Sequence, residues 1–273
     1  MSAAGGWWSD SDVIVGPAAT LILAGSPAGS LPGQMSPAFY STDYGAGYQL
    51  GAGSELQFSP YTLVTGDIRA EGDADITIGS SENIALADNL PLEEQMIYSL
   101  FNGFRNVYSG IVSAPQGRMA MTDTQWQMSG DSRTRTLRMT RSLAGFTGRG
   151  FNTLTTDTLQ ASQSAFALRT DLKNSDKIVV NQKAEGRDNT LFVNFLKKPS
   201  GKESLNIPLV SAPAGANPAM FKAAERVTGF SLVTPTLHTT EQDGKIQWVL
   251  DGFKSAPDKG SAASAKQLYG HGV

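Results

Sequence analysis

Residues 151–199 read FNTLTTDTLQASQSAFALRTDLKNSDKIVVNQKAEGRDNTLFVNFLKKP, and they decide the fold of this chain. Short runs that favour β-strands recur here with turn residues between them: Leu154–Thr155, Phe166–Leu168, Ile178–Val180 and Leu191–Val193. No run is long enough, or has the right period, to be a helix. Short strands that recur with a slowly drifting spacing are typical of a solenoid, in which each turn of the chain packs only on its neighbours.

The same rhythm extends toward the N-terminus. Ala74–Ile78 alternates apolar and polar residues, and it follows the strand Thr62–Ile68 after a turn at Glu71–Asp73. Further strands are expected at Met119–Met121, Trp126–Met128, Leu137–Met139 and Leu143–Phe146. Because strand centres are about seven to eleven residues apart, three strands make one turn of about 20 to 30 residues.

One segment differs from the rest of the chain. Asn89 is a candidate N-cap, and Pro91 suits the first helical turn. Apolar residues then recur at a spacing of four: Leu92, Met96, Leu100 and Phe104. This pattern predicts a short amphipathic helix near residues 91–102, with its apolar face against the stack of strands.

The C-terminal part of the chain changes pattern after Pro199. We expect a strand at Leu205–Val210, a short helical turn at Phe221–Val227, and a hairpin-like pair formed by Phe230–Val233 and Gly244–Leu250. The chain is therefore divided into residues 1–150, β-helical rungs with loops and the helix; residues 151–253, C-terminal rungs and a β cap; and residues 254–273, a flexible tail.

Composition limits the possible functions. Of the 273 residues 40% are hydrophobic, only 17% are charged and 29 are glycine, which suits an all-β protein with many turns. The net charge of −3 does not favour nucleic acid as a partner. With no cysteine and only two histidines, the chain offers no zinc site, and no sequence feature indicates a cofactor.

Gly130–Ser132 invites comparison with a serine protease, in which a nucleophilic serine follows Gly-Asp. That chemistry also requires a histidine base, a carboxylate that orients it and an oxyanion hole. Here Arg133 follows the serine, and the two histidines, His238 and His271, lie far along the chain. We therefore interpret Asp131 and Ser132 as turn residues that bond to backbone groups.

Two other sets of carboxylates were considered as sites. Gly72–Asp75 resembles half of a calcium-binding repeat but occurs only once, so we interpret it as a solvated turn. A paired-carboxylate site of a β-helical hydrolase or lyase would need carboxylates at a fixed separation. The candidates for it lie among lysines and arginines typical of a mixed surface: Asp171, Asp176, Glu185 and Asp188.

The aromatic residues have two interpretations. They could form a row that binds host glycans, as on the stalk of an adhesin, or they could fill the core and stack from one rung to the next. We favour the core, in which they would form a folding nucleus from which rungs are added one at a time. The candidates for this nucleus are Trp126, Phe146, Phe166, Phe192, Phe195, Phe230 and Trp248.

Three passages resemble a known family. They are YSLFNGFRNVYSG (residues 98–110), MTDTQWQMSGDSRTRTLRMTRSLAGFTG (121–148), and the strands and turns of residues 151–213. They resemble the C-terminal passenger region of the serine protease autotransporters of Enterobacteriaceae. The resemblance is most specific over residues 98–253. It implies a right-handed parallel β-helix stalk that ends in an autochaperone cap, which folds first and templates the other rungs.

The resemblance also implies a cellular setting. The parent protein would be a secreted or cell-surface virulence protease that crosses the periplasm and the outer membrane. Its partners would be its own β-barrel translocator and the outer-membrane assembly machinery, and its protease domain would cleave host proteins. We expect this chain to be a fragment without signal peptide, protease domain or barrel, either a cut-down piece or a truncated reading frame. It would itself carry no catalytic residue.

Overall fold

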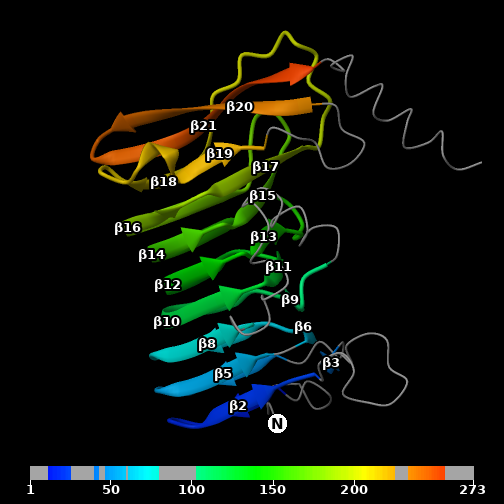
Figure 1. Cartoon of the computed structure of the whole chain (residues 1–273), viewed down its shortest axis with the longest axis vertical. Coiled ribbons are helices and arrows are strands. Elements are labelled where there is room, and N and C mark those ends of the chain that lie inside the picture. The colour runs from blue at the N-terminus through cyan, green and yellow to red at the C-terminus, as the bar shows by residue number, and fades with distance from the viewer. Residues whose placement is uncertain are drawn as a thin grey trace, which may run out of the picture.

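The computed structural model is an almost entirely β structure in which short strands stack into a column (Figure 1). It describes residues 12–25, 40–42, 47–59, 61–79, 103–224 and 233–255. The first strands lie at the bottom of the column in Figure 1, and the last hairpin lies at the top. The helix predicted near residues 91–102 and nearly all of the predicted tail lie outside the described residues.

The strands divide into a lower and an upper set. The lower strands are β1 (Val13–Val15), β2 (Thr20–Leu23), β3 (Tyr40–Thr42), β4 (Tyr48–Leu50), β5 (Ser54–Phe58), β6 (Thr62–Thr65), β7 (Ile68–Ala70), β8 (Ala74–Ile78) and β9 (Asn106–Ser109). The upper strands are β10 (Val112–Thr122), β11 (Thr124–Met128), β12 (Ser132–Thr140), β13 (Leu143–Phe146), β14 (Thr153–Ser162), β15 (Ala165–Thr170), β16 (Lys177–Arg187), β17 (Asn189–Phe195), β18 (Ile207–Pro213), β19 (Phe221–Ala223), β20 (Val233–Gln242) and β21 (Lys245–Ser255).

The strands form a 13-stranded and an 8-stranded sheet. In the lower column the series β1, β4, β7 and the series β2, β5, β8 form separate faces, and both pair with β10. The register of β10 shifts between Ala114 and Arg118, where the strand passes from one face to the other. Pairing is parallel from rung to rung as far as β18, which confirms the predicted parallel β-helix.

Two of three successive turns of the upper column have the expected length of about 20 to 30 residues, and one is shorter. Thr124 and Ser142 occupy equivalent corners 18 residues apart, and the next turns, to Ser164 and then to Asn189, take 22 and 25 residues. The predicted strand Thr62–Ile68 is instead two strands, β6 and β7. Gly66, with φ of 142°, turns the chain between two faces at this point.

The core consists of rows of inward-facing side chains that stack along the column. In one row the members are aligned by strand pairing and are buried: Tyr48, Ile68, Val112, Ser132, Leu154, Ile178, Val210 and Trp248. A second row is Leu56, Ile76, Met119, Leu137, Leu159 and Ala184. Each rung therefore buries its apolar face only against the rungs above and below it.

The corner before each strand of the 8-stranded sheet has a repeated pattern that the sequence analysis did not recognise. A residue with positive φ, such as Asp123 (48°) or Arg141 (47°), is followed by a buried polar residue. The backbone N–H of Thr124 donates to Ser142 Oγ, that of Ser142 to Ser164 Oγ, and that of Ser164 to Asn189 Oδ1, at 3.1–3.2 Å. This polar ladder satisfies buried backbone donors and so stabilises the left-handed backbone conformation at the corner.

Candidate functional site

The upper end of the column is closed by a change in strand direction. β18 pairs in parallel with β16 on one side and antiparallel with β21 on the other, and β20 pairs antiparallel with β21. A hairpin lies here as predicted, but its first strand is Val233–Gln242 and not Phe230–Val233, of which only Val233 lies within the described residues. Its second strand, Lys245–Ser255, contains most of the predicted Gly244–Leu250. A hairpin that runs against the stack ends the parallel series, so the next rung cannot simply be added there.

An aromatic cluster lies under this cap. The ring centroids of Phe166 and Phe221 are 5.8 Å apart, and those of Phe221 and Trp248 are 4.9 Å apart at an interplanar angle of 82°. Trp248 is 1% exposed, and its indole N–H donates to Pro218 O at 3.0 Å. The cluster thus joins a rung strand, β15, to the cap strand β21 through β19.

Phe221 lies on a strand, so the helical turn predicted at Phe221–Val227 is wrong for its described part, while residues 225–227 lie outside the described residues. Phe221–Ala223 is β19, and the helical turn is the 3₁₀ turn before it, Pro218–Met220. Asn217 explains the earlier start, because its side chain accepts a hydrogen bond from the N–H of Ala219 and Pro218 suits the first turn.

A second aromatic stack, here called the lower stack, runs from the lower column up to β11. Tyr48, Phe58, Tyr108 and Trp126 form a chain of contacts with centroid separations of 5.3, 5.9 and 6.3 Å. The Tyr108 hydroxyl donates to Gly66 O at 2.7 Å, and burial raises the pKa of Tyr108 well above its ordinary value. Three members of this stack, Tyr48, Phe58 and Tyr108, were not among the predicted nucleus residues.

The two stacks are separated by a single rung. Trp126 aligns with Ala144 in the next rung, and Ala144 aligns with Phe166 in the rung after that. Ala144 is fully buried. Because its side chain is only a methyl group, the row Trp126–Ala144–Phe166 has no aromatic ring in this middle rung. The nucleus candidates therefore belong to two clusters, not to one continuous row.

The remaining nucleus candidates lie at the sides of these clusters. Phe146 is buried at the end of β13. Phe192 is half-buried and packs against a small outer cluster that includes Leu143 and Ala165. Phe195 stacks on Phe253 of β21 with a centroid distance of 6.3 Å. Phe230 lies outside the described residues.

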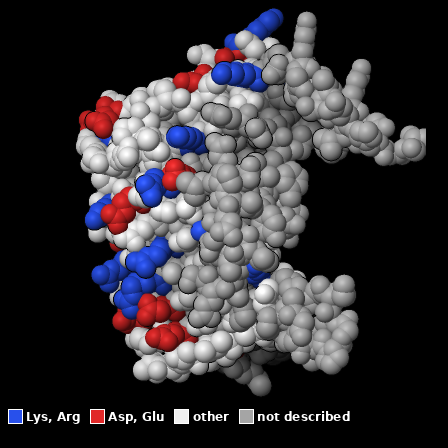
Figure 2. Space-filling model, viewed as in Figure 1, with Lys and Arg blue, Asp and Glu red and all other residues white. Residues whose placement is uncertain are grey.

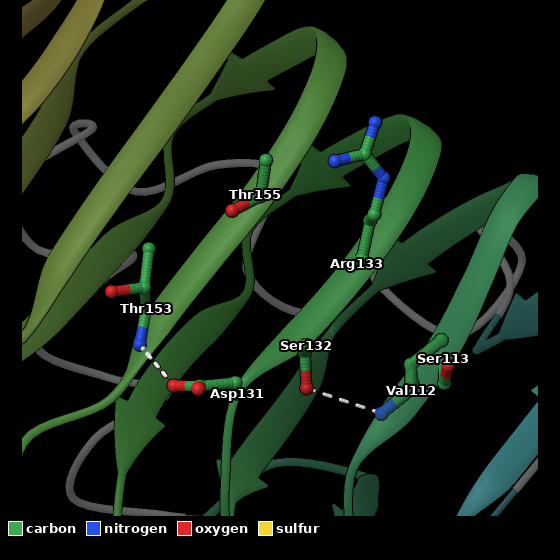
Figure 3. Close-up of a pocket in the computed structure, with 7 residues that line it drawn as sticks. All are labelled: Val112, Ser113, Asp131, Ser132, Arg133, Thr153 and Thr155. Atoms are coloured by element: carbon green, nitrogen blue, oxygen red, sulfur yellow. Dashed lines mark hydrogen bonds between the residues drawn. The ribbon is translucent and has the colours of Figure 1, made fainter.

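The Gly-Asp-Ser motif lies in the wall of the column (Figure 3). Ser132 is 4% exposed, and its hydroxyl accepts the N–H of Val112 at 3.1 Å. Asp131 accepts the N–H of Thr153 at 2.8 Å. Both side chains therefore bond backbone groups of neighbouring rungs, in agreement with the turn interpretation. A nucleophilic serine would instead need its hydroxyl on a base.

His238 has a carboxylate partner, but on a different part of the molecule. A β-bulge between Thr236 and Leu237 places Asp251 beside it, with 2.6 Å between His238 Nδ1 and Asp251 Oδ2. The Thr236 hydroxyl donates to the other oxygen of Asp251 at 2.7 Å. This pair lies on the cap hairpin, whereas Ser132 lies on β12, so the geometry does not assemble a triad from them.

The candidate carboxylates are also dispersed. Asp171 accepts two backbone N–H groups of its own turn, which lowers its pKa, and Glu185 bonds Gln160 and Lys183. Asp188 pairs with Arg187 at 3.6 Å. In the lower column, Asp73 accepts the N–H of Gly53 at 3.2 Å. Within the described ranges no group of three or more acidic or histidine side chains is placed to hold a metal ion.

Asp176 is fully buried and has a structural partner. Arg169 holds it through two contacts of 2.8 Å and one of 3.0 Å, and also donates to the carbonyl oxygens of Gly148 and Gly150. The N–H of Asn152 donates to the same carboxylate at 2.9 Å. This pair joins the turn after β13, at residues 148–152, to the turn after β15 in the next rung, and nothing in the sequence spacing indicated it.

Comparison with known proteins identifies relatives of the chain. Serine protease EspP of Escherichia coli is 36% identical over 97% of this chain, which spans 20% of EspP. The serine protease Pet autotransporter of Escherichia coli O44:H18 is 36% identical over 88% of this chain and 18% of its own length. The SepA autotransporter of Shigella flexneri is 28% identical over the full chain and 19% of its own length. No protein-family model matches.

A solved structure supports the fold. The Haemophilus influenzae Hap adhesin matches 86% of this chain with a TM-score of 0.52 and 14% sequence identity, over 22% of the adhesin chain. Along the described part of this chain, no helix is long and apolar enough to cross a membrane. Over nearly its whole length the chain is thus homologous to the serine protease autotransporters, of whose length it spans about one fifth, and it folds as a parallel β-helix.

Proposed function

We propose that this chain is the end of an autotransporter stalk and acts as its folding seed, with residues 151–253 as the C-terminal rungs and cap. The observation that carries the proposal is the asymmetry of the column: β18, β20 and β21 close its upper end with antiparallel pairing. In a stack stabilised by neighbouring rungs, folding can begin at any locally stable point and spread from there. A closed end that is rich in buried aromatic contacts is such a point.

The cap supplies stability that a rung in mid-stack cannot obtain from its own strands. Trp248 contacts Phe221 and Pro218, and Phe221 of β19 contacts Phe166 of β15, two strands below it, so the cap and the last rungs share one cluster. Once this cluster has formed, the exposed lower edge of each rung offers a template for the next. The parallel column then grows away from the cap.

The homology supports a setting for this activity. The chain would act at the cell surface or after secretion, as part of a longer autotransporter that is exported through its own translocator with the outer-membrane assembly machinery. Cleavage of host proteins would belong to a serine protease domain elsewhere in that longer protein. Folding outside the cell, from the end that emerges first, would supply a directional driving force for export.

A chimera tests the proposed function directly. This segment would replace the homologous segment of a full-length relative such as EspP, and the protease released into the medium would be measured. The parent segment is expected to support release, and a Trp248→Ala segment to reduce it strongly, because the cavity disrupts the cap.

Leu63→Ser is the matched control, because Leu63 is 39% exposed in the lower column and should not affect release. The proposal would be wrong if the Trp248→Ala chimera were released as well as the parent chimera. It would also be wrong if both substitutions reduced release equally.

A further inference from the structure

A group of arginines occupies the outer face of the middle rungs, and we call it the arginine patch: Arg118, Arg133, Arg135 and Arg138. All four side chains are exposed, three of them on the single strand β12 and one on the neighbouring strand β10. Figure 2 shows Lys and Arg side chains gathered on this flank of the column, with acidic side chains below them. The chain as a whole has a net charge of −3, so the patch is a local reversal of charge.

The patch is only partly neutralised by the protein. Arg118 pairs with Asp75 at 2.7 Å, and Arg133 approaches Asp157 at 3.6 Å. Arg138 donates to the neutral side chain of Gln160 at 3.0 Å. Among the described residues the guanidinium group of Arg135 has no partner. Asp75 and Asp73 therefore lie near Arg118, and Asp157 lies near Arg133. Glu185 lies near Arg138 but also pairs with Lys183, so the excess positive charge lies mainly at Arg135.

An open depression adjoins the patch. It measures about 190 Å³, and Arg133, Ser113, Thr153, Thr155 and Asp131 contribute to its lining. Figure 3 shows Arg133, Thr153 and Thr155 on adjacent strands around it. Within the described part of the chain the hydroxyl groups of Ser113, Thr153 and Thr155 have no hydrogen-bond partner. The depression thus offers hydroxyl groups and a carboxylate oxygen beside a guanidinium group, which are the groups that bind sugar hydroxyls and sulfate.

The chemistry of the patch selects among polyanions. Guanidinium groups bind the oxygens of sulfate in bidentate geometry, and they do so better than a point charge such as lysine. A flat anionic membrane would also have to contact the neighbouring rungs of β8 and β5, which carry Asp73, Asp75 and Glu55, and these carboxylates would repel it. A narrow linear polymer can follow β12 and avoid them. The free hydroxyl groups of the depression favour a sugar over a nucleic acid.

From this combination we infer that the outer face of β10, β12 and β14 binds a linear sulfated polysaccharide. Sulfate groups contact the arginine patch, and an adjacent sugar ring lies in the depression beside Thr153 and Thr155. This site is separate from the aromatic residues, which are largely buried in the core, and it goes beyond the folding role proposed above. It would add retention on a sulfated surface to the functions of the stalk.

Binding of heparin to the full chain tests the inference. The parent protein is expected to bind immobilised heparin in low salt and to lose affinity as salt is added. The double variant Arg133→Gln/Arg135→Gln should bind heparin with an affinity about tenfold lower or more, because two charge-assisted contacts are lost. Both side chains are exposed, so thermal unfolding of this variant should match that of the parent.

The matched control replaces Lys222→Gln and Lys245→Gln, which removes the same charge from exposed positions on β19 and β21. This control should bind heparin within about twofold of the parent. The inference is overturned if the parent does not bind heparin, or if the two double variants lose affinity equally. Three other ligands serve as comparisons: the unsulfated polysaccharide hyaluronan, vesicles of phosphatidylglycerol, and duplex DNA. The inference is also overturned if any one of them binds as tightly as heparin.

Discussion

The two ends of the column differ in how their last strands are covered. At the lower end β1, β2 and β3 each pair with a single strand among the described residues, and large apolar side chains are exposed: Ile14 is 68% exposed and Ile22 55%. At the upper end the antiparallel hairpin covers β18, and Ile246, Trp248 and Leu250 are 0–1% exposed. One fold therefore has an end at which rungs can be added and an end at which they cannot.

The ends also differ in their polar contacts. The ion pairs of the lower rungs, such as Arg69–Asp67, have both side chains well exposed. In the upper rungs the Arg169–Asp176 pair is buried, and the polar ladder ends at Asn189, whose amide donates to Ala161 O and Met220 O. Buried polar contacts tolerate only one register. The lower column has such contacts too, in the hydrogen bonds of Thr62 to Asn106 and of Tyr108 to Gly66. Among the described ion pairs, however, only Arg169–Asp176 has a fully buried carboxylate, so the upper end is specified more strictly in its ion pairing. This difference can be tested at single residues.

Trp248→Ala should have the largest effect. It removes a buried ring together with its hydrogen bond to Pro218, and should lower the free energy of unfolding by about 3–5 kcal/mol. If the capped end is the folding seed, this variant should also refold more slowly. Urea unfolding and stopped-flow refolding of the full chain measure the two effects.

Trp126→Ala is the matched comparison in the lower stack, because Trp126 is equally buried and also donates its indole N–H, to Gly110 O. It should destabilise the chain by a similar amount but act mainly on the unfolding rate. Equal slowing of refolding in both variants would remove the kinetic distinction between the two ends.

Arg169→Met should cost about 3 kcal/mol, because it leaves the fully buried carboxylate of Asp176 without its cation. Arg69→Met in the lower column should cost less than about 0.5 kcal/mol, since its ion pair with Asp67 is exposed. The comparison uses urea unfolding at pH 7. A cost of less than about 1 kcal/mol for Arg169→Met would contradict a strictly specified upper end.

Asp123, between the two regions, should make stability depend on pH. Burial raises its pKa to about 6 in spite of Arg105 at 3.2 Å. Between about pH 4 and 6 the carboxyl group of Asp123 is therefore protonated in the folded state and ionised in the unfolded chain. As pH rises through this window, the parent should lose on the order of 2 kcal/mol relative to Asp123→Asn. Urea unfolding of both proteins across this range measures the difference, and parallel pH profiles would contradict it.

Ile22→Thr should have the smallest effect. Ile22 lies 55% exposed on β2, and threonine keeps the branched side chain that suits a strand. The free energy of unfolding should change by less than about 0.5 kcal/mol. A loss of more than about 2 kcal/mol would show that the lower edge is covered and is not open.

The sequence predicted the rungs because short strands and turns repeat along it. It also indicated the burial of Trp126, Phe166 and Trp248, since large aromatic side chains on short strands are usually buried in the core and not exposed to solvent. It did not reveal the interruption at Ala144, because alignment between rungs depends on turn lengths that vary from 18 to 25 residues.

Other contacts could not be predicted because they depend on where the corners bring the chain. Arg169 and Asp176 are close in sequence, but their pairing is buried by the rung that contains Asn152. The helical turn was expected at Phe221 because the role of Asn217 as a cap had been overlooked. A signal for the polar ladder was present, since Thr124, Ser142, Ser164 and Asn189 each follow a strand by two residues, but it is legible only once the rungs are aligned.

Hydrogen exchange with pulse labelling during refolding of the full chain tests the central claim most directly. The backbone amides of β18, β20 and β21 should become protected first, those of β14 and β16 next, and those of β4 and β5 last. Protection that arises first in β4 and β5, or in all rungs at once, would contradict a folding seed at the capped end.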